Sequence, residues 1–188
     1  MTVRAWPALD SKAGKDVIIA SFLEDGHALR RSGFGPRLVY VLGGFVDDVL
    51  GTVDVYDPMT DGWKQVSSMP TKRCAHGCVA LDGKIYAMGG FNGDDGIISS
   101  ADVYDPQSDS WQPLAEMVSA RQEFAAATAG GKIYVIGGTE SDDDTTAAVE
   151  AFDPLLGTWA EVASMSVDRR NHAVAVVDGK IYAIGGYH

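Results

Sequence analysis

An aromatic-Asp-Pro triplet followed by a tryptophan occurs three times in the chain, at a constant interval of 48 residues. The three copies read YDPMTDGW (56–63), YDPQSDSW (104–111) and FDPLLGTW (152–159). Other residues recur in the same register: glycine pairs at 43–44, 89–90, 137–138 and 185–186, methionines at Met69, Met117 and Met165, and arginines at Arg73, Arg121 and Arg169. So many matches in register indicate a chain of repeated units, each of which packs on its neighbours.

Each unit is predicted to hold four short strands. An apolar run such as CAHGCVAL is followed by a two-residue turn (82–83, 130–131 and 178–179), typical of a hairpin that needs positive φ. A KIY strand then ends at the glycine pair, and a loop of variable length leads to a third strand that stops at the Asp-Pro step. The fourth strand starts at the tryptophan. An all-β fold of β-propeller blades, each with four antiparallel strands, is therefore expected.

The repeat divides the chain into unit one (37–69), unit two (70–117), unit three (118–165) and a partial unit four (166–188). Unit one is predicted to lack its opening strand, because residues 28–36 show no alternating apolar pattern. Residues 1–36 are an unassigned N-terminal extension, in which 16–23 (DVIIASFL) fits a strand or a short helix equally well. The prediction is an incomplete ring of three to three and a half blades, whose open sheet edges would favour self-association.

The paired glycines, the Tyr-Asp-Pro triplet and the tryptophan seven residues after its tyrosine resemble the kelch repeat, and the resemblance covers residues 37–188. The chain is similar to the kelch domain of BTB-kelch ubiquitin-ligase adaptors, and kelch propellers usually have six blades. The resemblance therefore implies that this chain is the front part of a longer domain, or else a half-ring that pairs with a second copy. Residues 1–36 hold no recognisable BTB domain. The resemblance also implies structural roles for the repeated glycines and aromatics: Gly43, Gly44, Tyr56, Trp63, Gly89, Gly90, Tyr104, Trp111, Gly137, Gly138, Phe152, Trp159, Gly185 and Gly186.

The residues that differ between units are predicted to lie on one face of the blades. Strand alternation brings the loop between the second and third strands to the same face as the connection into the next blade. The candidate binding residues there are Arg73, Ala75, Asp94, Asp95, Arg121, Glu123, Glu140, Asp142, Asp143, Asp144, Arg169 and Asn171. Acidic loops favour a partner segment that carries Lys or Arg. The alternatives are that the loops are merely solvated and that the arginines pack between blades.

Charge and composition narrow the class of partner. The net charge of −11 repels nucleic acid and anionic membranes. No apolar stretch near the start is long enough to span a bilayer or to form a signal peptide, so a cytoplasmic protein is expected. Cys74 and Cys78 are expected to be free thiols, because four residues of one strand separate them by about 13 Å.

Catalytic chemistry has little support in the residues. A galactose-oxidase-like copper site would need converging histidines and tyrosines, yet Phe124 stands where units two and four carry His76 and His172. A plant-specifier-like iron pattern begins at Glu140 and Asp144 but fails at Ala148. We therefore expect no catalytic residue, metal or cofactor.

The resulting hypothesis is a non-catalytic protein-interaction module, similar to the substrate-recognition part of a ubiquitin-ligase adaptor. Its partners would be proteins, including a ligase scaffold reached through other domains. The alternatives are a fragment of a sugar-processing kelch enzyme, of the sialic-acid-mutarotase or galactose-oxidase kind, and an actin-binding kelch protein.

Overall fold

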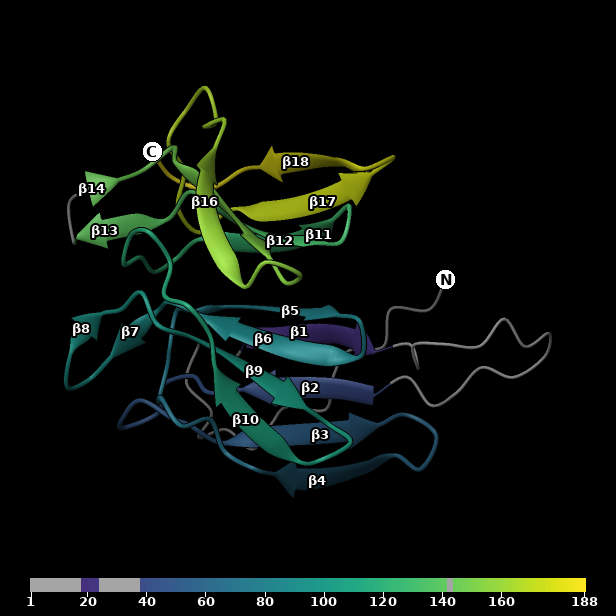
Figure 1. The fold of residues 1–188 in the computed structure, drawn as a ribbon. Helices are drawn as coiled ribbons and strands as arrows, with labels where there is room; N and C mark the ends of the chain where they lie inside the picture. The colour runs from purple at the N-terminus through teal and green to yellow at the C-terminus, as the bar shows by residue number, and fades with distance from the viewer. Residues whose placement is uncertain (1–17, 24–37, 142–143) are drawn as a thin grey trace.

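The structure is a computed structural model that describes residues 18–23, 38–141 and 144–188. The regular elements of these residues are all strands. Three four-stranded antiparallel sheets and the two-stranded sheet β17-β18 stack side by side, and two further two-stranded sheets are short hairpins in the loops (Figure 1). The predicted all-β class and the predicted blades of four antiparallel strands are confirmed.

The first sheet has the order β1-β2-β3-β4, with β1 (Ile18–Leu23), β2 (Leu38–Leu42), β3 (Val53–Asp57) and β4 (Gly62–Val66). The prediction that unit one lacks its opening strand is wrong, because β1 pairs antiparallel with β2. The strand lies further upstream than residues 28–36, in which an alternating apolar pattern is absent. Of the two interpretations of this segment, the strand is therefore the correct one for residues 18–23.

The second and third sheets repeat this arrangement. The second contains β5 (Gly77–Leu81), β6 (Lys84–Met88), β9 (Ala101–Asp105) and β10 (Ser110–Pro113). The third contains β11 (Ala125–Ala129), β12 (Lys132–Ile136), β15 (Val149–Asp153) and β16 (Thr158–Val162). The fourth sheet has only β17 (Ala173–Val177) and β18 (Lys180–Ile184), as predicted for a partial unit.

Two short hairpins lie in the loops between the second and third strands of their blades. They are β7 (Phe91–Asn92) with β8 (Gly96–Ile97), and β13 (Thr139–Ser141) with β14 (Asp144–Thr145). Figure 1 shows both at the same end of the molecule. The loops that vary most between units thus project together from one face.

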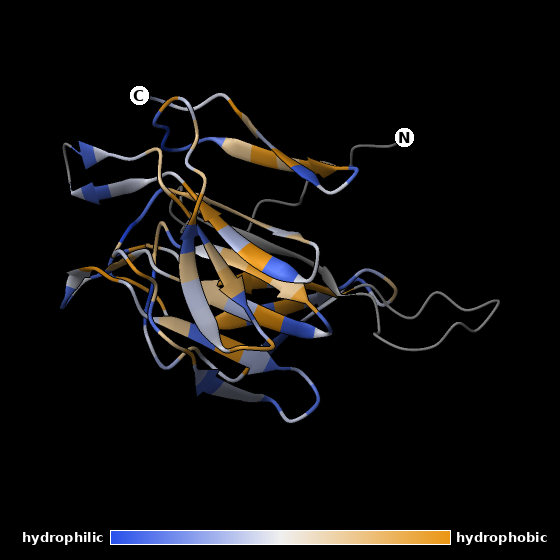
Figure 2. Cartoon of the chain, turned by 45° about the horizontal axis from the view of Figure 1, so that its top comes forward, coloured by the Kyte–Doolittle hydropathy of each residue, from blue (hydrophilic) through white to orange (hydrophobic). Residues whose placement is uncertain are grey.

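The opening strands of successive blades lie next to one another. β1 lies against β5, β5 against β11, and β11 against β17. The outermost strands are therefore β4, β10 and β16, which is the radial order of a propeller blade. Apolar residues are concentrated in the inner strands of the sheets, whereas outermost strands such as β4 carry more polar residues (Figure 2). The largest apolar core joins blades two and three and includes Met88, Phe124 and Phe152.

The two-residue turns have the predicted conformation, with positive φ at both positions of 82–83, 130–131 and 178–179. The strand that follows Arg73 is shorter than predicted, because it begins at Gly77 and excludes Cys74. Ala75, with φ of 49°, interrupts the extended backbone between the two cysteines. Both thiols are free, although the argument from four residues of one strand does not apply to them.

Glycine pairs bring successive blades into close contact. The amide of Gly90 donates to the carbonyl of Arg121 in the next blade over 2.8 Å, and Gly44 and Gly138 make the same bond to Arg73 and Arg169. A Cβ on Gly89 would lie 2.7 Å from the Arg121 carbonyl oxygen, and φ there is +54°. Both the contact and the conformation require glycine at this position.

Candidate protein-binding face

The face that bears β7–β8 and β13–β14 is the candidate site, here called the binding face. It consists of the loops 43–52 and 89–100, the described parts 137–141 and 144–148 of the third loop, and the connections 72–76, 120–124 and 168–172. Each connection pairs with the loop of its own blade through reciprocal backbone bonds, such as Cys74 N–H to Phe91 C=O at 3.0 Å and Gln122 N–H to Thr139 C=O at 3.0 Å. The binding face is thus a hydrogen-bonded surface rather than a set of independent loops.

Ala75, Glu123 and Asn171 occupy equivalent positions in consecutive blades. All three have positive φ, of 49°, 56° and 51°. The amide of Glu123 donates to the carbonyl of Ala75 at 2.9 Å, and the amide of Asn171 donates to the carbonyl of Glu123 at 2.8 Å. One backbone chain of hydrogen bonds therefore runs from blade to blade. It places an apolar, an acidic and an amide side chain at the same point of successive blades.

The arginines among the predicted binding residues occupy different environments. Arg73 and Arg121 are 0% and 1% exposed, and each guanidinium binds a carbonyl of the glycine pair in its own blade, Gly89 or Gly137. Since a buried guanidinium is not presented to a partner, we assign Arg73 and Arg121 to the framework between blades. Arg169 is only half-buried and donates to the carbonyl of Gly185 at 2.6 Å.

The partners of the buried arginines were not foreseen from the sequence. Arg73 forms an ion pair with Asp102 at 2.5 Å, and Arg121 with Glu150 at 2.7 Å. Glu150 is itself fully buried and also accepts from the amides of Val118 and Ser119. A signal was present, because acidic residues recur two positions before each aromatic of the triplet, at Asp54, Asp102 and Glu150.

The structure describes four of the acidic loop residues that were predicted to bind a partner, and all four lie on the binding face. Asp94, Asp95, Glu140 and Asp144 are exposed. Glu140 also approaches Arg121, at 3.5 Å. Asp142 and Asp143 lie outside the described residues, so their predicted roles stay untested.

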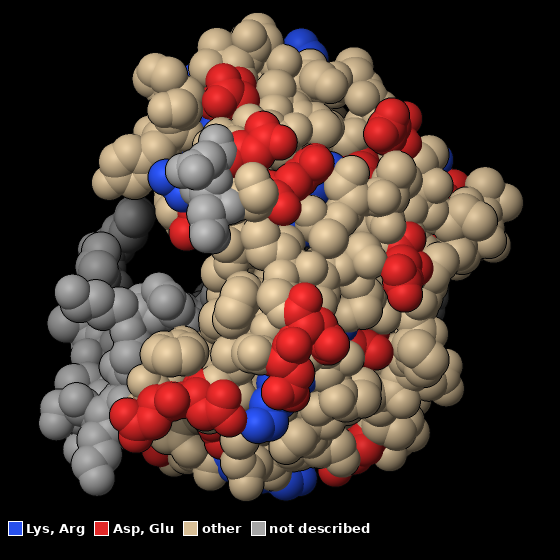
Figure 3. Space-filling model, turned by 90° about the vertical axis from the view of Figure 1, so that its left-hand side faces the viewer, with Lys and Arg blue, Asp and Glu red and all other residues tan. Residues whose placement is uncertain are grey.

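Two exposed or half-buried basic side chains of this face are paired with carboxylates. Lys72 donates to Asp48 at 2.9 Å, which holds the pKa of that carboxyl below its ordinary value. Arg170 pairs with Glu123 at 3.3 Å. Figure 3 views this face directly and shows acidic groups spread across it with few basic ones between them. The electrostatic character of the face is therefore acidic, which attracts cationic partners.

The histidines that were weighed as metal ligands are buried between blades. His76 and His172 are 2% and 9% exposed, and neither ring nitrogen of either residue has a hydrogen-bond partner. Burial, with a smaller contribution from Arg73, lowers the pKa of His76 to about 3. Among residues 18–23, 38–141 and 144–188, no group of three or more His, Cys, Asp or Glu side chains is arranged to hold a metal ion.

Phe124 replaces histidine at the equivalent position because of a compensating glycine. A Cβ on Gly77 of the preceding blade would lie 2.2 Å from Cε2 of Phe124. The residues equivalent to Gly77 in the next two blades are Ala125 and Ala173. The Phe124 ring thus occupies the space that a side chain at position 77 would need.

Stacked blades of this kind, joined through repeated glycine pairs and buried arginines, define a β-propeller of the kelch type. The chain belongs to the KLHDC2/KLHL20/DRC7 Kelch-repeats domain family, which matches residues 25–186.

Known relatives support this assignment over shorter segments. Kelch-like protein 3 of Danio rerio is 43% identical over 58 residues, which is 31% of this chain and 10% of that protein. Kelch-like protein 3 of Homo sapiens and Kelch-like protein 2 of Rattus norvegicus are each 40% identical over the same length and shares. The match therefore spans about a tenth of the length of these relatives.

A solved structure titled "Structure of YjhT" has the same fold, with a TM-score of 0.70 at 17% identity. The superposition covers 91% of this chain and 58% of that one. Within the described residues there is no helix with the length and hydrophobicity needed to span a bilayer.

Proposed function

We propose that this chain is a non-catalytic protein-interaction module whose binding face holds a segment of a partner protein. The observation that carries the proposal is the hydrogen-bonded row of Ala75, Glu123 and Asn171. The framework around this row repeats from blade to blade, whereas its side chains differ in size and charge. A rigid backbone with variable side chains is the arrangement that gives specificity for one partner sequence.

The acidic character of the face selects the class of partner. Asp94 and Asp95 form no ion pair with another described residue, and Glu123 is only partly neutralised by Arg170. A segment rich in Lys or Arg would gain most from these charges, chiefly in association rate and specificity. We therefore propose a basic partner segment.

The relatives named Kelch-like protein 2 and 3 extend the proposal to the whole protein. Within it, this module would be the substrate-recognition part of a ubiquitin-ligase adaptor, and the scaffold would be contacted by other domains. The proposal places the module in the cytoplasm, where free thiols such as Cys74 and Cys78 stay reduced.

Selection from a random peptide library against the 188-residue protein tests the proposal. We expect enriched peptides to be basic and each to lose affinity when Glu123 or Asp94 is changed to Lys. An exposed ion pair contributes about 0.2–1 kcal/mol, so loss of one pair should weaken binding roughly 1.4- to fivefold.

The matched control is Glu161→Lys, which makes the same charge change on the exposed outermost strand β16. Equal weakening by Glu161→Lys would mean that only net charge matters, and enrichment of acidic or purely apolar peptides would contradict the proposed partner class.

A further inference from the structure

Lys72 forms an ion pair across the boundary between blades one and two. Its ammonium donates to Oδ2 of Asp48 at 2.9 Å, and the two side chains are 57% and 69% exposed. The connection that carries Lys72 is fixed to the loop of blade one, because the amide of Arg73 donates to the carbonyl of Leu50 at 3.0 Å. The lysine is therefore held beside this loop by the backbone as well as by its charge.

Both carboxylate oxygens of Asp48 are engaged. Oδ1 accepts from the amide of Val49 at 2.8 Å, and Oδ2 accepts from Lys72. A second cation placed at Oδ2 would lie beside the Lys72 ammonium and be repelled by it. A basic group of a partner therefore gains the full attraction of Asp48 only if Lys72 moves away.

Asp94 is the residue of blade two equivalent to Asp48, and the loops that carry them are in contact. A Cβ on Gly93 would lie 3.7 Å from Oδ1 of Asp48. The hydrogen bond to Asp48, the charge of Asp48 and, to a smaller extent, the charge of Asp94 raise the pKa of Lys72 above its ordinary value. One lysine thus interacts with the acidic loops of two blades.

The lysine has no counterpart in the next two units, where Ala120 and Asp168 occupy the equivalent positions. The neighbouring Arg73 is different, since it recurs in each unit and is buried against Asp102. The repeat therefore requires the arginine but not the lysine. An exposed ion pair of this kind contributes little to stability, so Lys72 can act on binding rather than on folding.

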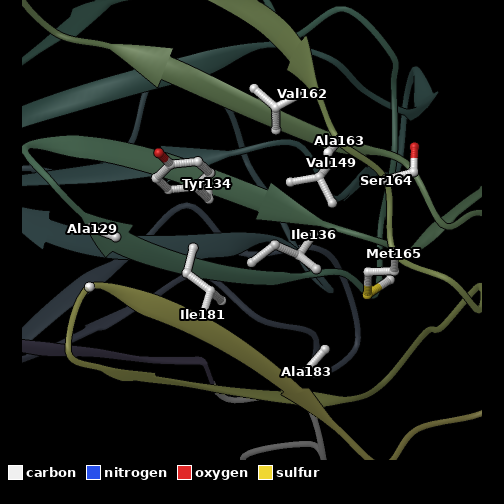
Figure 4. A pocket seen from close by; sticks show the side chains of 11 residues that line it. Ala129, Tyr134, Ile136, Val149, Val162, Ala163, Ser164, Met165, Ile181 and Ala183 are labelled. Carbon is white, nitrogen blue, oxygen red and sulfur yellow. The ribbon is translucent and has the colours of Figure 1, made fainter.

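The pocket elsewhere in the described chain does not suit a basic group. It has a volume of about 390 Å³, lies between the third blade and the fourth sheet, and is lined by 11 residues (Figure 4). The lining side chains are mainly apolar, such as Tyr134, Val149 and Ile181, and none of them is charged. A cation would be desolvated there without a counter-charge, whereas the loops of blades one and two supply carboxylates.

We propose, on the basis of the function proposed above, that Lys72 is an intramolecular competitor, and that an arginine of the partner binds Asp48 and Asp94 by displacing its ammonium. A guanidinium presents five donors in a planar fork and can donate to two carboxylates at once. A lysine of the partner would only replace one ammonium by another. The competitor therefore lowers the affinity for every basic segment and leaves arginine as the residue that the two loops select.

The test measures the anisotropy of fluorescently labelled nona-arginine with the 188-residue protein at one fixed ionic strength. Lys72→Met removes the charge and keeps the aliphatic stem, so it should strengthen binding about two- to fivefold. The matched control is Lys84→Met, which removes the lysine of an exposed ion pair with Asp105 beside the turn 82–83, on the opposite face. Equal strengthening by both variants would overturn the proposal, because only net charge would then matter.

Asp48→Asn separates displacement from a general effect of the Lys72 charge. This variant should bind nona-arginine more weakly, and in it Lys72→Met should strengthen binding by less than about 1.5-fold, since there is no ion pair left to break. The same gain from Lys72→Met with and without Asp48 would overturn the proposal.

Nona-lysine tests the choice of arginine. It should bind the unchanged protein more weakly than nona-arginine, and Asp48→Asn should reduce this preference, because the guanidinium then meets one carboxylate instead of two. Equal affinities of the two peptides for the unchanged protein would overturn the assignment to arginine.

The outcomes also distinguish this competition from the function on which it rests. If Asp94→Lys weakens the binding of nona-arginine while Lys72→Met leaves it unchanged, the competition is refuted and the basic partner segment stands. If no variant and not the unchanged protein binds nona-arginine saturably, both are refuted.

Discussion

Nη2 of Arg73 lies 2.5 Å from Oδ2 of Asp102, and these side chains are only 0% and 5% exposed. Burial lowers the pKa of Arg73, and its hydrogen bond to Asp102 opposes that shift. The pair joins the connection into blade two to the third strand of that blade. It is a part of the framework on which the binding face rests.

Loss of one partner of this pair should be strongly destabilising. Asp102→Ala leaves the Arg73 guanidinium buried without its counter-charge, which costs about 3–5 kcal/mol. Arg169→Ala, which removes an equivalent arginine without an ion pair to a described residue, should cost about 1 kcal/mol. Urea unfolding of both variants checks this, and similar losses would contradict the assignment of Arg73 to the framework.

Glycine at the first position of each pair should matter most where another blade packs on it. Gly89→Ala would bring a Cβ to 2.7 Å from the Arg121 carbonyl and from Cε of Met117, so overpacking adds about 1–3 kcal/mol to the cost of positive φ. Gly185→Ala has φ of +73° but no atom within 4 Å of the new Cβ, so only the conformational cost of about 1–2 kcal/mol remains. Melting temperatures of the two variants should separate these effects, and equal values would refute the packing argument.

Gly77 and Phe124 should behave as a coupled pair. Gly77→Ala places a Cβ against the Phe124 ring and should destabilise the protein by about 1–3 kcal/mol. Phe124→His, which restores the residue found in blades two and four, should recover part of that loss in the double variant. A double-mutant cycle measures the coupling. Strict additivity would show that the two side chains do not contact each other.

Stability should fall at mildly acidic pH because of His76. Its pKa is about 3 in the folded protein and 6.5 for the ordinary group, so the unfolded chain binds a proton that the folded chain does not bind between these values. Stability is complete above pH 6.5 and decreases as the pH falls toward 3. At pH 5 the loss is about 2 kcal/mol.

His76→Gln removes this titration. The difference in unfolding free energy between pH 7.5 and pH 5 should therefore be smaller in the variant by about the same 2 kcal/mol, measured in urea. An unchanged difference would show that His76 is accessible to protons in the folded state.

Much of the fold could be predicted because the repeat fixes turns and strand ends locally. Asp82-Gly83 needs positive φ at both positions, and the Asp-Pro step ends strand pairing at Pro58 and its equivalents, whatever the rest of the chain does. The strand β1 could not be placed in this way. Its assignment depends on pairing with β2 across residues 24–37, and such a distant contact leaves no local pattern.

The candidate site was predictable in position but not in detail. Strand alternation placed Glu123 and Asp94 on one face, because it follows from connectivity alone. The burial of Arg73 and Arg121 depends on carboxylates 29 residues away, at Asp102 and Glu150. The row of backbone bonds from Ala75 to Asn171 joins three blades, so it is a property of their packing.

Amide hydrogen exchange of the 188-residue protein, with and without a peptide selected from the library, shows directly whether the binding face holds the partner. We predict slower exchange in residues 74–76, 89–98, 121–124 and 137–141 on peptide binding, and unchanged exchange in the turns at 82–83, 106–109 and 130–131 on the opposite face. Protection confined to those turns, or spread over the outermost strands β4, β10 and β16, would contradict the proposed binding face.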